Sequence, residues 1–498
     1  MNVNPITRLD YPDPDVIRVE DTYYMVSTTM HFMPGCEILQ SFDLVHWEHA
    51  TYVYETLDHT DAQQLKSGQN IYGQGMWAAS LRYHEGRFYI CFVANDTRKT
   101  YLYTSEKIDG PWKKQLIEGF YHDGSLLFDE DGRNYIVYGN DEIWITELNE
   151  DLTAPKKDGL HRLLVSDHKN PELGYEGSHI QKINGYYYIF LVHSLRDRWM
   201  RTEACFYSDS LEGEFTGGDV LCDDRGYCGQ GVAQGGIVDT PDGKWYAMLF
   251  QDSGAVGRIP ILLPVTWKDH FPVFGQNGHV PEEIEVHSTR PGYIYQPLVG
   301  SDDFCNGLLP RWQFNHDPDP RYYHLDALQG TYTITTREVC TELTQAVNTL
   351  TQRMSYPSCA AEVTVDASAL KEGDVAGLCA LQSCYAAVGI TKHHGKYEVL
   401  MLDKKEDGIL DMTEGTVVES HQMDFRLEAD FCNMKDEARC YYRVNKGDWL
   451  PIGTVHKLYF KLDHFTGCRF GLFCYAAEKT GGSACFRDFK YYDVDEIS

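Results

Sequence analysis

This sequence contains a pattern that is repeated five times. At the same position of each repeat stands a side chain that could do chemistry: a carboxylate in three repeats, an amide in one and a tryptophan in one. In each repeat, a turn-forming pair of residues is followed three positions later by a tyrosine that begins an aromatic or β-branched run. About twelve residues before these tyrosines lie Asp13, Trp77, Asp123, Glu176 and Gln234. Separate carboxylates that converge on an aromatic-lined pocket are suited to acid and base catalysis. We therefore expect these five positions to form one site, although they are far apart in the sequence.

The repeats that must position these residues have the features of propeller blades. The five tyrosines are Tyr24, Tyr89, Tyr135, Tyr188 and Tyr246. Repeats of roughly fifty residues, built from short strands around a tight hairpin, are typical of a blade. Five blades place five equivalent strand starts around one axis. A single Asp-Gly or Asn-Gly turn occurs in any antiparallel protein, but five turns with matching offsets favour a five-bladed propeller.

A second region follows the repeats, which end near residue 275. Residues 291–304 are interpreted as a connector, and from about residue 301 short alternating strands occur without the blade turn. Such alternation with few helix signals predicts a β-sandwich. The expected fold is thus all-β, with a propeller in residues 1–296 and a concanavalin-like sandwich in residues 302–498. The sandwich could bind carbohydrate, shape the pocket or stabilise the fold; structural roles are favoured.

Composition excludes several classes of function. The formal net charge of −30 over 498 residues argues against a nucleic-acid partner and against attraction to anionic membranes. The amino terminus lacks a signal-peptide pattern, and no segment has the apolar length of a membrane span, so we expect a cytoplasmic protein. The fifteen cysteines are an odd number, and most lie in apolar runs, which predicts buried free thiols. No zinc-ligand spacing accompanies Cys222 and Cys228.

Five segments of the chain resemble those of a known family. YPDPDVIRVEDTYYMVSTT, MWAASLRYHEGRFYICF, HDGSLLFDEDGRNYIVYG, YEGSHIQKINGYYYIFLV and AQGGIVDTPDGKWYAMLF resemble successive blades of glycoside hydrolase family 43. Its members are five-bladed propeller enzymes that cleave arabinofuranosyl or xylosyl linkages with inversion. DDFCNGLLPRWQFNHDPDPRYY is similar to the sandwich of the β-xylosidase and arabinofuranosidase branches. The resemblance covers nearly the whole chain.

The resemblance implies catalytic roles for the three carboxylates that the offsets also select. Asp13, in the Pro-Asp-Pro element, would be the general base, and Glu176, in the Glu-Gly-x-His element, the general acid. Asp123, in the Asp-x-Ser-Leu element, would orient the acid and raise its pKa while remaining ionised. An inverting enzyme holds its two carboxyl groups roughly 6.5 to 9.5 Å apart to admit a water molecule. Each residue alone could instead cap a turn or lie in a solvated loop.

Substrate contacts are expected from Trp77, Arg258, His31, Phe32 and Gln234. Trp77 could stack on a pentose ring, or it could be a core residue. Arg258 resembles the family's arginine that binds substrate hydroxyls, with an ordinary surface arginine as the alternative. His31 and Phe32 are expected at the rim of the pocket, although core packing of Phe32 is the competing interpretation.

Gln234 stands where many family members have a histidine that helps hold a calcium ion or water in the channel. An amide oxygen could still bind calcium. We therefore expect no required cofactor and no confident metal site, and leave a structural calcium open.

The resemblance, together with the three carboxylates, implies an inverting exo-glycosidase. It would hydrolyse terminal β-D-xylosyl and/or α-L-arabinofuranosyl residues of short hemicellulose oligosaccharides. One alternative is a non-catalytic carbohydrate-binding propeller. Another is a retaining fructan or sucrose glycosidase, whose Asn-Asp-Pro motif is absent because Pro12 precedes Asp13. The partner would be a xylo- or arabino-oligosaccharide, and a homo-oligomer is left open.

Overall fold

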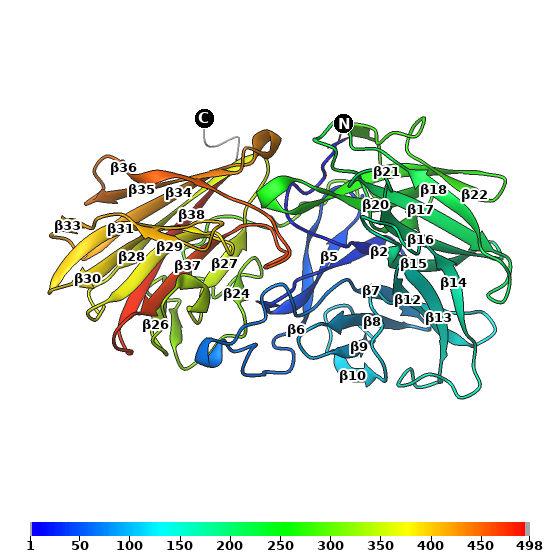
Figure 1. Cartoon of the computed structure of the whole chain (residues 1–498), viewed down its shortest axis with the longest axis horizontal. Coiled ribbons are helices and arrows are strands. Elements are labelled where there is room, and N and C mark those ends of the chain that lie inside the picture. Colours follow the sequence, from blue (N-terminus) through cyan, green and yellow to red (C-terminus); the bar gives the residue numbers. More distant parts are fainter. Residues whose placement is uncertain (1, 494–498) are drawn as a thin grey trace.

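The computed structural model describes residues 2–493, which form two β-rich parts lying side by side (Figure 1). One part contains five four-stranded antiparallel sheets, each made of strands that are consecutive in the chain apart from β4. Blade 1 contains β2 (Asp15–Val19), β3 (Thr22–Ser27), β5 (Gly35–Ser41) and β6 (Glu48–Tyr54). Blade 2 contains β7 (Ser80–His84), β8 (Arg87–Ala94), β9 (Lys99–Ser105) and β10 (Lys113–Ile117).

The remaining three blades repeat this arrangement. Blade 3 contains β11 (Ser125–Phe128), β12 (Asn134–Asn140), β13 (Glu142–Leu148) and β14 (His161–Ser166). Blade 4 contains β15 (Glu176–Ile183), β16 (Tyr186–Ser194), β17 (Arg201–Ser208) and β18 (Thr216–Leu221). Blade 5 contains β19 (Gly236–Asp239), β20 (Trp245–Asp252), β21 (Arg258–Lys268) and β22 (Phe271–Phe274). The predicted five-bladed propeller is confirmed.

The first strands of the blades, β2, β7, β11, β15 and β19, contact one another around the channel. The five tyrosines of the sequence pattern all lie on the second strands, β3, β8, β12, β16 and β20. The ring closes through side chains of blades 1 and 5, where Arg18 Nε donates to the Asp239 carbonyl at 3.1 Å. Beside this junction, β1 (Asn2–Val3) pairs antiparallel with β23 (Glu283–Ile284).

The second part is the predicted β-sandwich, made of two large antiparallel sheets. One sheet runs in the order β32 (Leu410–Met412), β31 (Lys396–Lys404), β30 (Ala386–His393), β29 (Asp374–Leu381), β37 (Arg469–Ala476), β27 (Leu350–Arg353), β24 (Gln313–Asn315) and β4 (Phe32–Met33), with β33 (Thr416–Val418) beside β31. The other runs in the order β25 (Tyr323–Asp326), β26 (Thr331–Thr335), β38 (Ser483–Asp493), β28 (Ser358–Asp366), β34 (Gln422–Asp430), β35 (Glu437–Val444) and β36 (Leu450–Lys457). In β35, Ala438, Cys440 and Tyr442 are buried while the residues between them are more exposed, as the period of two requires.

The two parts share a continuous interface. Strand β4 leaves blade 1 and pairs with β24 of the sandwich. The short 3-10 helix η2 (Gly254–Val256) buries Ala255 and Val256 in the sandwich core. A buried ion pair of 2.9 Å joins Arg353 of the sandwich to Glu37 of blade 1. The other short 3-10 helices are η1 (Lys66–Gly68), η3 (Leu343–Gln345) and η4 (Cys432–Met434).

Two further observations bear on the composition of the chain. Within residues 2–493, no helix combines the length and the apolar character needed to cross a membrane. All fifteen cysteines are free thiols, and most are buried.

Candidate active site

The residues selected by their offsets lie at equivalent starts of the five inner strands. Asp13 precedes β2 by two residues, Asp123 precedes β11 by two residues, and Glu176 is the first residue of β15. All three therefore lie at one end of the channel. The backbones of Asp13 and Asp123 are left-handed, with φ of 52° and 47°. This conformation is uncommon outside glycine, although aspartate tolerates it better than most residues, and such strain concentrates at functional sites.

Asp13 is buried and accepts hydrogen bonds on both carboxylate oxygens. Arg258 Nη1 donates to Oδ1 at 2.8 Å, and the Thr28 hydroxyl donates to Oδ2 at 2.6 Å. Arg258 itself is only 2% exposed, so the alternative of an ordinary surface arginine is wrong. Its Nε and Nη2 atoms have no hydrogen-bond partner within residues 2–493. This arginine thus orients Asp13, and two of its buried nitrogens are left without a partner among the described residues.

Asp123 and Glu176 meet around a histidine that the offset argument did not select. His122 Nε2 lies 3.7 Å from Asp123 Oδ2 and 3.6 Å from Glu176 Oε2. Glu176 Oε2 also accepts a hydrogen bond of 2.7 Å from Asn140 Nδ2. The position of His122 next to Asp123 in the sequence was a signal, but its contact with Glu176 depends on the adjacency of blades 3 and 4.

The charges of this cluster shift its titration. The Asp123 carboxylate raises the pKa of His122 to about 9; burial of the ring opposes the rise and Glu176 adds to it. Burial raises the pKa of Asp123 to about 6, His122 opposes this rise, and Glu176 and Asp13 add to it. Asp123 was expected to stay ionised while it raises the pKa of Glu176. With a pKa near 6 it is mostly ionised at neutral pH and becomes partly protonated in mildly acidic solution, because its side chain is buried beside two other carboxylates.

The Glu-Gly pair of the acid motif has a geometric reason. Gly177 adopts φ of 66°, and its N–H donates to Asp123 Oδ2 at 2.9 Å. A Cβ atom at Gly177 would lie 2.2 Å from Cδ of Gln234. Glycine therefore allows the backbone to bind Asp123 while the Gln234 side chain packs against it, which accounts for the position of Gln234 in the site.

An aromatic wall is completed by the sandwich. The loop that precedes β37 places the Phe465 ring 5.7 Å from the Trp77 ring, and the Arg258 guanidinium lies 4.3 Å from the same phenylalanine ring. Trp77 is half-buried and lies edge-on to His122 at 5.9 Å. The loop is anchored on the propeller, since the Gly467 N–H donates to Asp10 Oδ2 at 2.8 Å. The sandwich therefore contributes a side chain beside Trp77 and Arg258 of the propeller.

His31 and Phe32 do not lie at the rim as expected. Both are buried, with 0% and 2% of their surface exposed. Phe32 packs beneath the Arg469 guanidinium at 3.4 Å, and His31 lies beside the Tyr72 and His316 rings. Core packing of Phe32 is thus the correct interpretation. The reason is that β4 leaves blade 1 and joins the sandwich sheet, which carries both side chains into the interface.

In the channel below the acids, one carboxylate is already bound by cationic or imidazole groups. Asp15 of β2 is fully enclosed, and its carboxylate receives Arg82 Nη1 at 2.8 Å and His179 Nδ1 at 3.1 Å. Calcium takes about six to eight oxygen ligands, and the Asp15 carboxylate would not be free to act as one of them, so a structural calcium near Gln234 stays a prediction. Within the described residues, the group that could hold a metal is His122, Asp123 and Glu176, which belongs to the site itself.

A hollow of about 460 Å³ opens at the other ends of the inner strands. Its lining includes Arg18, Lys182 and Glu130. Arg18 is bound to Asp239, and Lys182 to Glu130 at 3.1 Å. Since its charged groups are already paired, this hollow is not the candidate site.

Comparison with known proteins agrees with the arrangement. The model of glycosyl hydrolases family 43 matches residues 3–272, and that of the beta xylosidase C-terminal concanavalin A-like domain matches residues 301–492. A beta-xylosidase of Formosa agariphila is 26% identical over 99% of this chain and 89% of its own. A non-reducing end alpha-L-arabinofuranosidase of Bacteroides ovatus is 24% identical over 82% of this chain and 79% of its own.

Solved structures of family 43 proteins are also similar to this chain over nearly its whole length. A bifunctional GH43-CE protein of Bacteroides eggerthii has a TM-score of 0.92 and 41% identity over 99% of this chain. This chain spans 64% of that bifunctional protein. An engineered GH43 enzyme, described as both an endo-xylanase and an exo-arabinofuranosidase, has a TM-score of 0.86 and 27% identity over 99% of both chains.

Proposed function

The chain belongs to glycosyl hydrolases family 43 and is a glycoside hydrolase, and from this premise we propose that it is an inverting, exo-acting pentosidase. Its substrates would be short xylo- or arabino-oligosaccharides from which it removes terminal β-D-xylosyl and/or α-L-arabinofuranosyl residues. The observation that carries the proposal is the position of Asp13, Asp123 and Glu176 at equivalent starts of inner strands, where Asp123 and Glu176 share His122 and the charge of Asp13 also acts on Asp123. The names of the xylosidase and arabinofuranosidase relatives support the sugar class.

The proposed reaction divides the work between two carboxyl groups. Asp13, oriented by Arg258 and Thr28, takes a proton from a water molecule whose oxygen attacks the anomeric carbon. Glu176 gives its proton to the glycosidic oxygen as the bond to the leaving sugar breaks. The attack from the face opposite the leaving group inverts the anomeric configuration. No cofactor takes part in these steps.

The exo mode is inferred from the loop of the sandwich that lies against the propeller beside Trp77 and Arg258. Trp77 and Phe465 contribute aromatic surface from opposite parts of the molecule, and Arg258 lies against the Phe465 ring. A pocket closed by a loop of the sandwich accommodates a terminal sugar better than the middle of a polymer chain. The free donors of Arg258 would bind hydroxyl groups of that sugar.

Initial rates with para-nitrophenyl β-D-xyloside and para-nitrophenyl α-L-arabinofuranoside test the substrate class, with Asp13→Asn as the blank. Proton NMR of the first-formed anomer tests inversion. Glu176→Gln should lower turnover of xylobiose at least about 100-fold but spare aryl glycosides with good leaving groups. Glu130→Gln, at the opposite end of the channel, is the matched control and should leave both rates unchanged. Full activity of Glu176→Gln on xylobiose would refute its role as acid.

The alternative of a carbohydrate-binding propeller without catalysis predicts no turnover of either aryl glycoside. The cytoplasmic location and the oligomeric state stay predictions, which cell fractionation and light scattering would test.

A further inference from the structure

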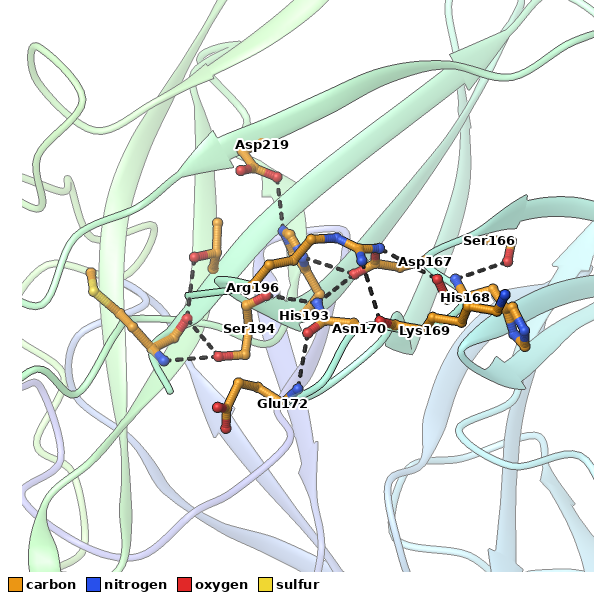
Figure 2. Close-up of polar contacts among 12 residues, drawn as sticks. Ser166, Asp167, His168, Lys169, Asn170, Glu172, His193, Ser194, Arg196 and Asp219 are labelled. Carbon is orange, nitrogen blue, oxygen red and sulfur yellow. Dashed lines mark hydrogen bonds and ion pairs between the residues drawn. The ribbon is translucent and has the colours of Figure 1, made fainter. Parts of the chain in front are cut away.

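Figure 2 shows a polar cluster around Asp167, His193 and Arg196, which involves the loop that precedes the proposed acid. Residues 167–175 connect β14 of blade 3 to β15 of blade 4, and the next residue is Glu176. Both ends of the loop are tied to Asp141, because the Asp167 N–H donates to the Asp141 carbonyl and the Asp141 N–H donates to the Tyr175 carbonyl, each at 2.9 Å. The adjacent Asn140 binds Glu176 directly.

The middle of the loop is tied to the end of β16. The Ser194 N–H donates to the Leu173 carbonyl at 2.9 Å. Asn170 Nδ2 in turn donates to the Ser194 carbonyl at 2.9 Å. The loop is thus fixed against blade 4 immediately before the chain reaches Glu176.

Asp167 is the centre of these contacts. Its carboxylate is buried and accepts hydrogen bonds from Asn170 Nδ2 at 2.7 Å and from Arg196 Nη2. His193 Nδ1 lies 3.2 Å from the same carboxylate. Arg196 also donates to the Lys169 carbonyl at 3.3 Å. One buried carboxylate therefore joins the loop 167–175 to β16 and to the hairpin 195–200.

His193 lies at the centre of this junction. Its Nε2 atom lies 2.8 Å from Asp219 of β18, so the ring is placed between two carboxylates. Burial lowers the pKa of His193, but Asp219 and Asp167 outweigh it and raise the pKa above its ordinary value. The other groups at the ring are Tyr175, whose ring lies at 5.1 Å, and Arg196, which shares Asp167. The His193 ring and Arg196 thus both bind Asp167.

We propose that Asp167, together with His193 and Arg196, is a positioning residue for the acid Glu176. The inference rests on the proposed function, because it concerns how that function's acid is held. These three residues, which we call the clamp, fix the loop 167–175 so that Glu176 stays within hydrogen-bond reach of the glycosidic oxygen. Displacement of a catalytic group by about 1 Å can cost about 100-fold in rate, so loosening the loop would affect the protonation step most.

The decisive experiment compares Asp167→Asn on xylobiose and on dinitrophenyl β-D-xyloside. The amide keeps the shape of the side chain but removes the charge that binds His193 and Arg196. We expect kcat on xylobiose to fall at least about tenfold with little change in KM, and kcat on the activated xyloside to fall less than about threefold, because a good leaving group needs little protonation. Equal losses on both substrates, or no loss on either, would overturn the proposal.

The matched control is Asp131→Asn. Asp131 also binds an arginine, Arg133, at 2.7 Å, but this pair is exposed at the β11–β12 turn. It should change neither rate. If Asp167→Asn does not fold, Arg196→Gln removes the half-exposed arginine that binds Asp167. Its kcat should show the same dependence on the leaving group, with smaller losses.

Hydrogen exchange separates failure of the clamp from failure of the proposed function. The amides of Asp141 and Ser194 donate to the loop and should exchange at least about tenfold faster in Asp167→Asn whichever glycoside is the substrate. Unchanged protection of these amides would refute the clamp even if the enzyme is a pentosidase. Faster exchange in a protein inactive on every pentoside would refute only the substrate assignment.

Discussion

Replacement of His122 by asparagine should move the acid limb of the pH–rate profile to higher pH. The variant loses a cation that lies 3.7 Å from Asp123 and 3.6 Å from Glu176. A unit charge at this distance contributes about 4 kcal/mol at an effective dielectric constant of about 20, which corresponds to about three pKa units. Because 20% of the His122 side chain is exposed, solvent screens part of this effect, and we expect about one to two units.

The direction follows from the sign of the interaction. His122 lowers the pKa of Asp123, which is about 6 in the native protein. Without the imidazolium, Asp123 binds its proton more tightly and becomes ionised only at higher pH. Measurement of kcat/KM for para-nitrophenyl β-D-xyloside across the acid range would show the shift. His161→Asn is the control, since His161 lies on the outer strand β14 and binds Thr146 at 3.0 Å. An acid limb that stays in place in His122→Asn would refute the reasoning.

The same histidine should make stability depend on pH. The pKa of His122 is about 9 in the folded protein, above its ordinary value of 6.5. The contribution of His122 to the free energy of unfolding is therefore fully present below about pH 6.5 and is lost as the pH rises through about 9. The shift corresponds to about 3 kcal/mol at most. Urea unfolding at the two ends of this range should show the loss in the native protein and a smaller loss in His122→Asn; equal slopes would contradict the assigned pKa.

Two other changes have distinct expected results. Phe465→Ala should raise KM about tenfold, since an aromatic contact contributes about 0.5–1.5 kcal/mol beyond its buried area. Leu462→Ala, in the same loop but 73% exposed, is the control and should leave KM unchanged. Equal KM values for the two variants would argue against an aromatic wall. Gly177→Ala should destabilise the protein by about 1–3 kcal/mol more than Gly185→Ala in thermal unfolding. Both glycines have positive φ, but only the first would bring a Cβ against Gln234 while the second faces open space; equal losses would show that this contact has no effect.

Most of the propeller could be predicted because its signals are local. A hairpin turn and a tyrosine that opens the next strand depend on neighbouring residues, and the five tyrosines all lie on second strands. The offsets then place Asp13, Asp123 and Glu176 at the starts of inner strands, since equivalent residues of equivalent blades occupy equivalent places around an axis. The sandwich was likewise predictable from alternation with a period of two.

The details of the pocket depend on contacts between distant segments. His31 and Phe32 follow a blade strand in the sequence, yet pairing of β4 with β24 buries them in the interface. Phe465 has no signal of its own, because its contact with Arg258 exists only when the sandwich docks on the propeller.

The sequence by itself thus determined the repeat, its five strand starts and the three carboxylates at them, because each is encoded within one blade. Tertiary structure alone decided which side chains surround those carboxylates. His122, next to blade 3, contacts Glu176 of blade 4. Asp167, in the loop that precedes Glu176, contacts His193 of blade 4. The physical reason is that charge and burial depend on the neighbours that packing brings within a few ångströms, which spacing along the chain does not record.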